Sequence, residues 1–261
     1  MLTYLPISVQ IYVSALAFVL GAVLGSGLNC LAYRMAREQK WTKGHSVCPA
    51  CGAQLKARDL IPVISWLALK GKCRSCKAPV SPRYFITEVG LGLLFLATVW
   101  KFGLTLEVLV WLIFLCCLFC LSLVDLETQI IPDRFLLIPA VARMALLLAQ
   151  GGFGSLWAGV WPGLVVGGAV LAISLIMDKV LKKVSMGGGD IKLLAVLGLY
   201  FGLAQSLLLV VLACFAGIAL AAALVKAKPG AAFPFGPALA AAAVITMFIG
   251  EPVIGWYLGL F

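Results

Sequence analysis

Asp125 and Asp190, two of the ten acidic residues, each adjoin the end of a long apolar segment. Asp125 follows an apolar run in LSLVDLETQIIPD, and Asp190 lies between three glycines and another apolar run in GGGDIKLL. Two carboxylates brought together in a partly dry site cannot both ionise comfortably, so they share a proton. One can then act as a base on water while the other, as an acid, polarises a carbonyl group, as in aspartic proteolysis. Residues 187–189 have no side chains, so the backbone there can approach an extended peptide.

Each acid also has a structural interpretation. Asp190 could cap the helix that follows it, and Asp125 could be a solvated loop acid like Glu127 and Asp133. Acids within a membrane also serve proton pathways, so a transporter or channel is one alternative. It predicts internal symmetry and broken helices near the midplane, and no repeat is found. Two further alternatives remain. One is a methyltransferase or scaffold in which the acids are inert, and the other is a peptidase of the Ser-Lys type that uses Lys192.

Two CxxC motifs lie in the one long polar stretch: Cys48 and Cys51 in CPAC, and Cys73 and Cys76 in CRSC. Paired motifs of this spacing suit tetrahedral coordination of a structural zinc ion. Unrelated thiols or a redox pair are the alternatives. Because the thiolates suffice for zinc, we expect the single histidine, His45, to be an ordinary surface residue, which argues against a histidine-based hydrolase.

The composition is that of an integral membrane protein: 63% of the residues are hydrophobic, 11% are charged, and the mean hydropathy is +1.11. Eight apolar segments are predicted to span the bilayer, at residues 7–31, 84–100, 106–124, 135–150, 156–177, 190–203, 205–225 and 237–258. The net charge of +10 comes largely from the polar stretch, since 11 of the 20 Lys and Arg residues lie between Arg34 and Arg83. This distribution indicates contact with anionic lipid and argues against nucleic acid.

The charge bias also predicts the topology. It places residues 34–83 in the cytoplasm and both termini outside, so that Asp125 and Asp190 lie at the same cytoplasmic face. The break between the sixth and seventh segments depends on this rule. A single long helix over residues 191–225 is the alternative, and it would place Lys226 on the outer face.

Several longer motifs follow one another along the chain. They are GSGLNCLAYRM, HSVCPACGAQL, DLIPVISWLALKGKCRSC, SPRYFITE, DLETQIIPDRF, MGGGDIKLL and PFGPAL. In this order they resemble the motifs of the type IV prepilin peptidases, bacterial members of the GxGD intramembrane aspartyl proteases. Gly27 and Cys30 depart from the family's GSFLNVxxYR pattern.

The resemblance implies an enzyme of the bacterial inner membrane. Such an enzyme removes the basic leader of type IV prepilins or type II secretion pseudopilins, cutting after a glycine on the cytoplasmic side. The resemblance makes Asp125 and Asp190 the catalytic pair, and Gly187 and Gly189 the glycines of GxGD. It makes Asp133 a supporting residue of the active site.

The expected fold is an all-α polytopic membrane protein of about eight transmembrane helices. Residues 1–33 form the first helix, residues 34–83 form a small cytoplasmic zinc-binding insert and methyltransferase region, and residues 84–261 form a seven-helix aspartyl peptidase domain. The resemblance further implies N-methylation of the new N-terminal residue with S-adenosylmethionine. Glu88 is the candidate for binding this cofactor or the amine, and a helix-start carboxylate favoured by the helix dipole is the alternative. The loop at 234–237 either lines the substrate channel or simply starts a helix.

Overall fold

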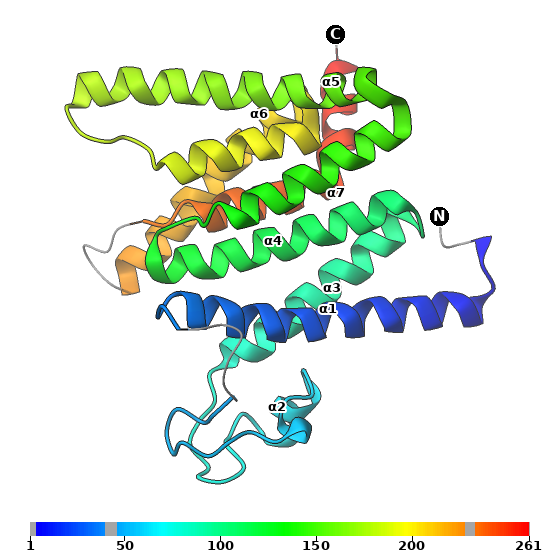
Figure 1. The fold of residues 1–261 in the computed structure, drawn as a ribbon, viewed down its shortest axis with the longest axis vertical. Coiled ribbons are helices and arrows are strands. Elements are labelled where there is room, and N and C mark those ends of the chain that lie inside the picture. Colours follow the sequence, from blue (N-terminus) through cyan, green and yellow to red (C-terminus); the bar gives the residue numbers. More distant parts are fainter. Residues whose placement is uncertain (1–3, 40–45, 228–232, 261) are drawn as a thin grey trace. The chain divides into compact units, whose positions relative to one another are not determined.

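The computed structural model in Figure 1 describes residues 4–39, 46–227 and 233–260. His45 lies outside these residues. Within them the regular structure is helical, apart from two isolated β-bridges. Six of the helices are long and apolar enough to cross a membrane, judged by length and composition. The predicted fold class, an all-α multi-pass membrane protein, is therefore confirmed.

The chain divides into two compact units, residues 1–120 (unit 1) and 121–261 (unit 2). Unit 1 contains α1 (Ile7–Met35), the short helices η2 (Ala57–Asp59) and α2 (Ile64–Ala68), α3 (Pro82–Phe102) and most of α4 (Leu106–Thr128). Unit 2 contains the end of α4, α5 (Arg134–Leu181), α6 (Gly188–Ala227) and α7 (Gly236–Leu258).

Small residues allow α1 and α3 to pack closely in unit 1. A Cβ atom on Gly21 would lie 2.7 Å from the carbonyl oxygen of Leu91, and one on Gly92 would lie 2.9 Å from the ring of Phe18. Interfaces of this kind are typical of membrane helices, where backbones approach at small residues. The pair holds the end of α1 and the start of α3 beside each other, and the polar insert connects these two ends.

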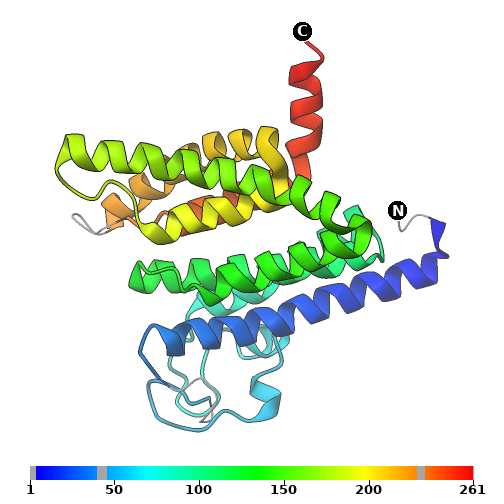
Figure 2. The ribbon, with the colours of Figure 1, turned by 45° about the horizontal axis from the view of Figure 1, so that its top comes forward.

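Two helices of unit 2 are broken at glycines. In α5 the backbone leaves the helical region at Gly151 and Gly152, and in α6 it does so at Gly202, where φ is 66°. The chain reverses direction at both breaks (Figures 1 and 2). The six long helices thus provide eight helical segments among the described residues, and the alternative of one helix over residues 191–225 is wrong.

The first half of α6 is fixed against α5. A Cβ atom on Gly198 would lie 2.7 Å from the Cα atom of Gly163, so the two helices touch backbone to backbone. The Tyr200 hydroxyl donates a hydrogen bond of 2.8 Å to the Pro139 carbonyl. The Arg143 guanidinium of α5 lies 5.6 Å from the centroid of the Tyr200 ring. These contacts give the first half of α6 a defined position against α5.

Candidate active site and metal site

Asp125 is a buried acid at the end of a transmembrane helix. It lies in the last turn of α4, and only 4% of the residue is exposed. Its Oδ2 atom accepts a hydrogen bond of 2.9 Å from the backbone N–H of Gly236, the first residue of α7. The interpretation of Asp125 as a solvated loop acid is therefore wrong.

Asp190 lies close enough to Asp125 for their charges to interact. It is the third residue of α6, which begins at Gly188, so it belongs to the first helical turn and is not the capping residue. The structure thus brings the two predicted acids together at one end of unit 2. We refer to Asp125 and Asp190 as the acid pair.

Two helix N-termini meet at the acid pair. Asp190 lies in the first turn of α6, and Asp125 accepts an N–H group from the first turn of α7. The N-terminal end of a helix carries a partial positive charge and N–H groups that lack helical partners. Both helices therefore stabilise negative charge on the pair, in which Asp125 is buried and Asp190 is partly buried.

The three glycines before Asp190 do not form a hinge. Gly188 and Gly189 are already helical, and none of the three has a positive φ. A Cβ atom on Gly187 would lie 3.1 Å from Oδ2 of Asp190, and one on Gly189 would lie 3.0 Å from Cβ of Ile131. A Cβ atom on Gly188 would meet no other atom within 4 Å. Close packing around the acid, rather than flexibility, accounts for glycine at 187 and 189.

Asp133, predicted to support the site, forms an ion pair with Lys192. The Lys192 Nζ atom lies 2.8 Å from Oδ1 of Asp133, and both side chains are more than half exposed. The pair connects the start of α5 to the first turns of α6. Because Lys192 is engaged by a carboxylate at the surface, the structure does not favour it as the base of a Ser-Lys peptidase.

The four cysteines of the insert form one cluster in unit 1. Their sulfur atoms all lie within 4.8 Å of one another, and those of Cys48 and Cys76 are 3.9 Å apart. A tetrahedron of zinc–sulfur bonds of about 2.3 Å has edges of about 3.8 Å. None of the four cysteines is in a disulfide. The thiols of Cys48, Cys51, Cys73 and Cys76 therefore fit a single tetrahedral metal ion.

The two CxxC turns are structurally equivalent. In each turn the N–H of the first cysteine donates to the carbonyl five residues later, Ala53 or Ala78. The residue four positions after that cysteine has a left-handed backbone, with φ of 71° at Gly52 and 63° at Lys77. The insert thus contains the same turn twice, once around each cysteine pair. Sequence reasoning did not recognise the repeat, because Lys77 occupies the left-handed position that Gly52 occupies in the first turn.

The backbone around the cluster favours a thiolate at Cys73. The N–H groups of Cys76 and Ser75 hydrogen-bond to its sulfur and lower the pKa of Cys73 to about 7. Cysteine binds metal as the thiolate. The turn therefore favours at Cys73 the deprotonated form in which cysteine can bind a metal ion.

Comparison with known proteins places these features in a family. Residues 19–102 match the bacterial peptidase A24 N-terminal domain, and residues 112–222 match the type IV leader peptidase family. The chain is 32% identical to a prepilin leader peptidase/N-methyltransferase of Stutzerimonas stutzeri, with 93% of this chain and 92% of the relative covered. A relative of the same name from Pseudomonas putida is 34% identical, with 93% of this chain and 92% of the relative covered. Another from Bacillus subtilis (strain 168) is 30% identical, with 94% of this chain and 97% of the relative covered. The chain belongs to the type IV leader peptidase family. No solved structure gave a significant match.

Glu88 lies in the part of the chain, residues 19–102, that matches the bacterial peptidase A24 N-terminal domain. Its side chain is buried, and Oε2 accepts a hydrogen bond of 2.7 Å from the N–H of Val63. Since α3 begins at Pro82, Glu88 lies beyond the first turn, and the interpretation of a helix-start carboxylate is wrong. Glu88 lines a pocket together with Cys48 and Cys73.

Sequence reasoning did not identify Gly236 as part of the acid site. It treated the segment around this residue as a channel-lining loop or a helix start, and α7 does begin there. The structure adds the hydrogen bond to Asp125, and a Cβ atom on Gly236 would lie 2.7 Å from Oδ2 of that acid. The PFGPAL motif was the available signal, because a glycine between aromatic and proline residues marks a constrained backbone.

Proposed function

We propose that this protein is a prepilin leader peptidase and N-methyltransferase of the bacterial cytoplasmic membrane. As a peptidase it removes the basic leader of a prepilin or pseudopilin, cutting after a glycine at the cytoplasmic face. The names of the relatives support both activities. The observation that carries the proposal is the acid pair, formed where the end of α4 meets the starts of α6 and α7.

Peptide cleavage uses the acid pair as a base and an acid. The N–H of Gly236 stabilises negative charge on Asp125, which takes a proton from water as the water oxygen attacks the scissile carbonyl carbon. Asp190 donates its proton to the carbonyl oxygen. Collapse of the tetrahedral intermediate breaks the C–N bond, the leaving amine takes the proton from Asp125, and Asp190 recovers the proton it gave. The pair then shares one proton again.

The peptidase and the methyltransferase use different parts of the chain in this proposal. Residues 84–261 contain the acid pair. Gly187 and Gly189 support it by close packing, and Asp133 gives minor support from the surface through its ion pair with Lys192. Residues 34–83 form the methyltransferase region, where S-adenosylmethionine supplies the methyl group. The thiolates of Cys48, Cys51, Cys73 and Cys76 hold a structural zinc ion, because four sulfur ligands leave no position for water.

The proposed topology follows the positive charges. The insert at 34–83 and the acid pair face the cytoplasm, both termini lie outside, and the basic residues next to the spans contact anionic lipid. This arrangement brings the acid pair to the face on which the basic leader of a prepilin lies.

The proposal is tested with the purified protein in detergent, a prepilin substrate and mass spectrometry of the product. We expect a mass loss equal to the leader, with a further gain of about 14 Da, one methyl group, when S-adenosylmethionine is present. An uncleaved substrate, in a preparation that retains zinc and native melting behaviour, would contradict the peptidase assignment.

A further inference from the structure

The polar insert of unit 1 exposes a group of large apolar side chains. In the described part of the insert they gather in and just before α2, and Val47 is the one other. The group consists of Leu60, Ile61, Ile64 and Leu67, and we refer to these four residues as the α2 patch. Ile64 is 64% exposed and Leu67 is 54% exposed. Grouped apolar surface outside the membrane spans marks an interaction site.

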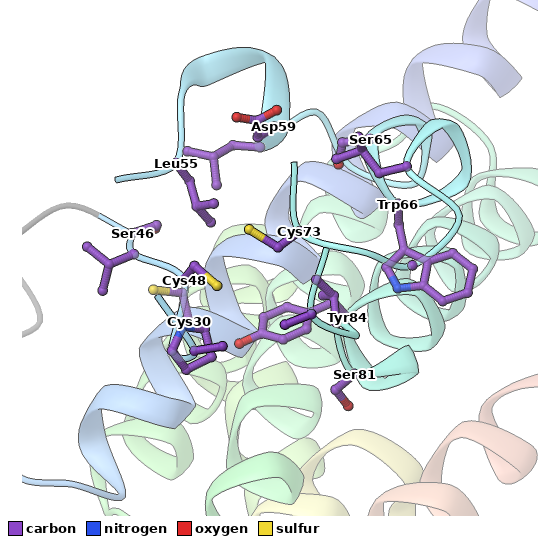
Figure 3. A pocket seen from close by; sticks show the side chains of 18 of the residues that line it. Cys30, Ser46, Cys48, Leu55, Asp59, Ser65, Trp66, Cys73, Ser81 and Tyr84 are labelled. Carbon is purple, nitrogen blue, oxygen red and sulfur yellow. The ribbon is translucent and has the colours of Figure 1, made fainter. Parts of the chain in front are cut away.

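The helix α2 is apolar on its outer side as well as on its inner side. Ser65 and Trp66 line the pocket that Glu88 also lines (Figure 3), and Leu69 lines it one turn later. Ile64 and Leu67 are no part of the pocket wall, and because they are three residues apart in one helix, they lie next to each other. A helix that is apolar all round is normally buried. The outer side of α2 therefore requires an apolar cover.

Two contacts fix α2 at a defined level along α3. The N–H of Val63, the residue before α2, donates a hydrogen bond of 2.7 Å to Oε2 of Glu88. The Trp66 ring stacks on Phe85, with 4.9 Å between the ring centroids. Glu88 follows Pro82, the first residue of α3, by six positions, which is about 9 Å along the helix axis. The helix α2 is therefore held beside α3 and not beyond its end.

The length of α3 converts this level into a depth in the membrane. The helix has 21 residues, so it is about 31 Å long and matches the hydrocarbon core of a bilayer, about 30 Å thick. A level about 9 Å from its start lies in the cytoplasmic leaflet. At this level α3 exposes Ile86, an apolar residue of a membrane span that lipid covers. Interfacial helices place their apolar face about 5–10 Å into the boundary between head groups and acyl chains, so the depth of α2 fits such a helix.

The charge of the insert suits an anionic membrane surface. Residues 46–83 contain seven basic residues and one acid. The acid, Asp59, is already engaged by Arg74, with 2.6 Å between its Oδ1 atom and the Arg74 Nε atom. Lys70 and Lys72 follow α2 closely and are exposed. Lysine side chains next to a membrane surface extend to the head groups and attract anionic lipid.

We propose that the α2 patch inserts into the cytoplasmic leaflet of the bilayer. Acyl chains cover Ile64 and Leu67, and anionic head groups contact Lys70 and Lys72. The insert is then bound to the membrane surface rather than free in the cytoplasm. A protein partner would have to displace lipid at the level of Glu88 to reach the patch, so the depth favours lipid as the occupant. This inference goes beyond the proposed function and depends on neither activity.

The test labels the full-length, zinc-loaded protein with a lipid-soluble diazirine reagent in vesicles of phosphatidylethanolamine and phosphatidylglycerol. Mass spectrometry of the peptides locates the label. We expect residues 60–69 to be labelled as strongly as the α3 segment around Ile86, and about tenfold more strongly than the second cysteine turn, residues 73–79. That turn is the internal reference, because it exposes Arg74, Ser75 and Lys77 and has no exposed large apolar side chain.

Two kinds of variant sharpen the test. Ile64→Gln combined with Leu67→Gln should lower the labelling of residues 60–69 severalfold, and zinc content should be retained because both side chains are more than half exposed. Val47→Gln is the matched control, since Val47 is an exposed apolar residue of the insert outside the patch, and it should leave this labelling unchanged. A benzophenone amino acid in place of Leu67 should form adducts with the mass of a phospholipid.

Three results would overturn the inference. One is wild-type labelling of residues 60–69 that is no stronger than that of residues 73–79, because the patch would then lie in water. Another is adducts from position 67 with a second copy of this chain or another protein instead of lipid, because a protein would then cover the patch. The third is undiminished labelling in the double Gln variant. None of them affects the proposed peptidase and methyltransferase, which are tested by the mass of the prepilin product.

Discussion

The backbone N–H of Gly236 donates a hydrogen bond of 2.9 Å to Oδ2 of Asp125. The two residues are 111 positions apart in the sequence, at the start of α7 and the end of α4. The contact supplies a donor to a carboxylate that is almost fully buried, and it points the positive end of α7 at that carboxylate. It also requires glycine, because any side chain at 236 would begin 2.7 Å from the same oxygen.

Gly236→Ala should therefore impair cleavage strongly. The added methyl group forces Asp125 or the start of α7 to move, and displacements of about 1 Å in a catalytic group cost about 100-fold in rate. The measurement is kcat/KM for a purified prepilin. Gly255→Ala is the control in the same helix, because a Cβ atom there meets nothing within 4 Å, and its rate should stay within twofold. Equal rates for the two variants would show that the contact with Asp125 is unimportant.

Gly187 and Gly188, which precede Asp190, should respond differently to substitution by alanine. Gly188→Ala should retain cleavage and gain helix stability of up to about 1 kcal/mol, because this helical position has open space. Gly187→Ala should lower the cleavage rate about tenfold, since its Cβ atom would press on Asp190 at 3.1 Å. Rates and melting temperatures of the two variants measured side by side test this order. A reversed order would mean that flexibility, and not packing, determines the motif.

Lys192→Gln should have little effect on cleavage. The side chains of Lys192 and Asp133 are 60% and 62% exposed, and exposed ion pairs contribute about 0–1 kcal/mol. We expect kcat/KM within fivefold of the wild type for Lys192→Gln, for Asp133→Asn and for the double variant. Loss of a general base would instead cost about 100-fold or more, so such a loss in Lys192→Gln alone would revive the Ser-Lys mechanism.

Cys48→Ser should affect methylation more than cleavage. It removes one of four clustered sulfur ligands, so the protein should lose its zinc and the insert should unfold at lower temperature. Zinc content, melting temperature and both activities are measured on the same preparation. Cys214→Ser is the control, because Cys214 lies outside the cluster in α6. Complete loss of cleavage in Cys48→Ser at normal protein level would show that the two activities are not separable.

The sequence was sufficient for features that depend on local pattern and charge. The rule that basic loops stay inside predicted the break in α6, and the structure has it at Gly202. Hydropathy predicted that Asp125 and Asp190 stand at helix ends, and the order of the segments predicted that these ends meet. The spacing of the cysteines predicted a metal cluster. Each of these follows from residues that are near in sequence or from a rule of topology.

Features that depend on distant backbone could not be predicted. The donor for Asp125 is a main-chain N–H, which every residue has, and only the packing of α7 beside α4 selects Gly236. In the same way Glu88 is held by the N–H of Val63, whose left-handed φ of 64° no sequence signal indicated. The different surroundings of Gly187 and Gly188 also arise from packing, because the glycines are identical as residues.

The central claim is that Asp125 and Asp190 perform the cleavage together. The most direct measurement is cleavage of a purified prepilin by Asp125→Asn and by Asp190→Asn, with Glu127→Gln as the control, since Glu127 is an exposed acid near the end of α4. Asparagine keeps the shape of each side chain and an oxygen that can accept hydrogen bonds, but it cannot exchange the proton. We predict no detectable cleavage by either Asn variant at normal protein stability, and a wild-type rate for the control. Cleavage by either Asn variant at a rate near that of the wild type would contradict the acid-pair mechanism.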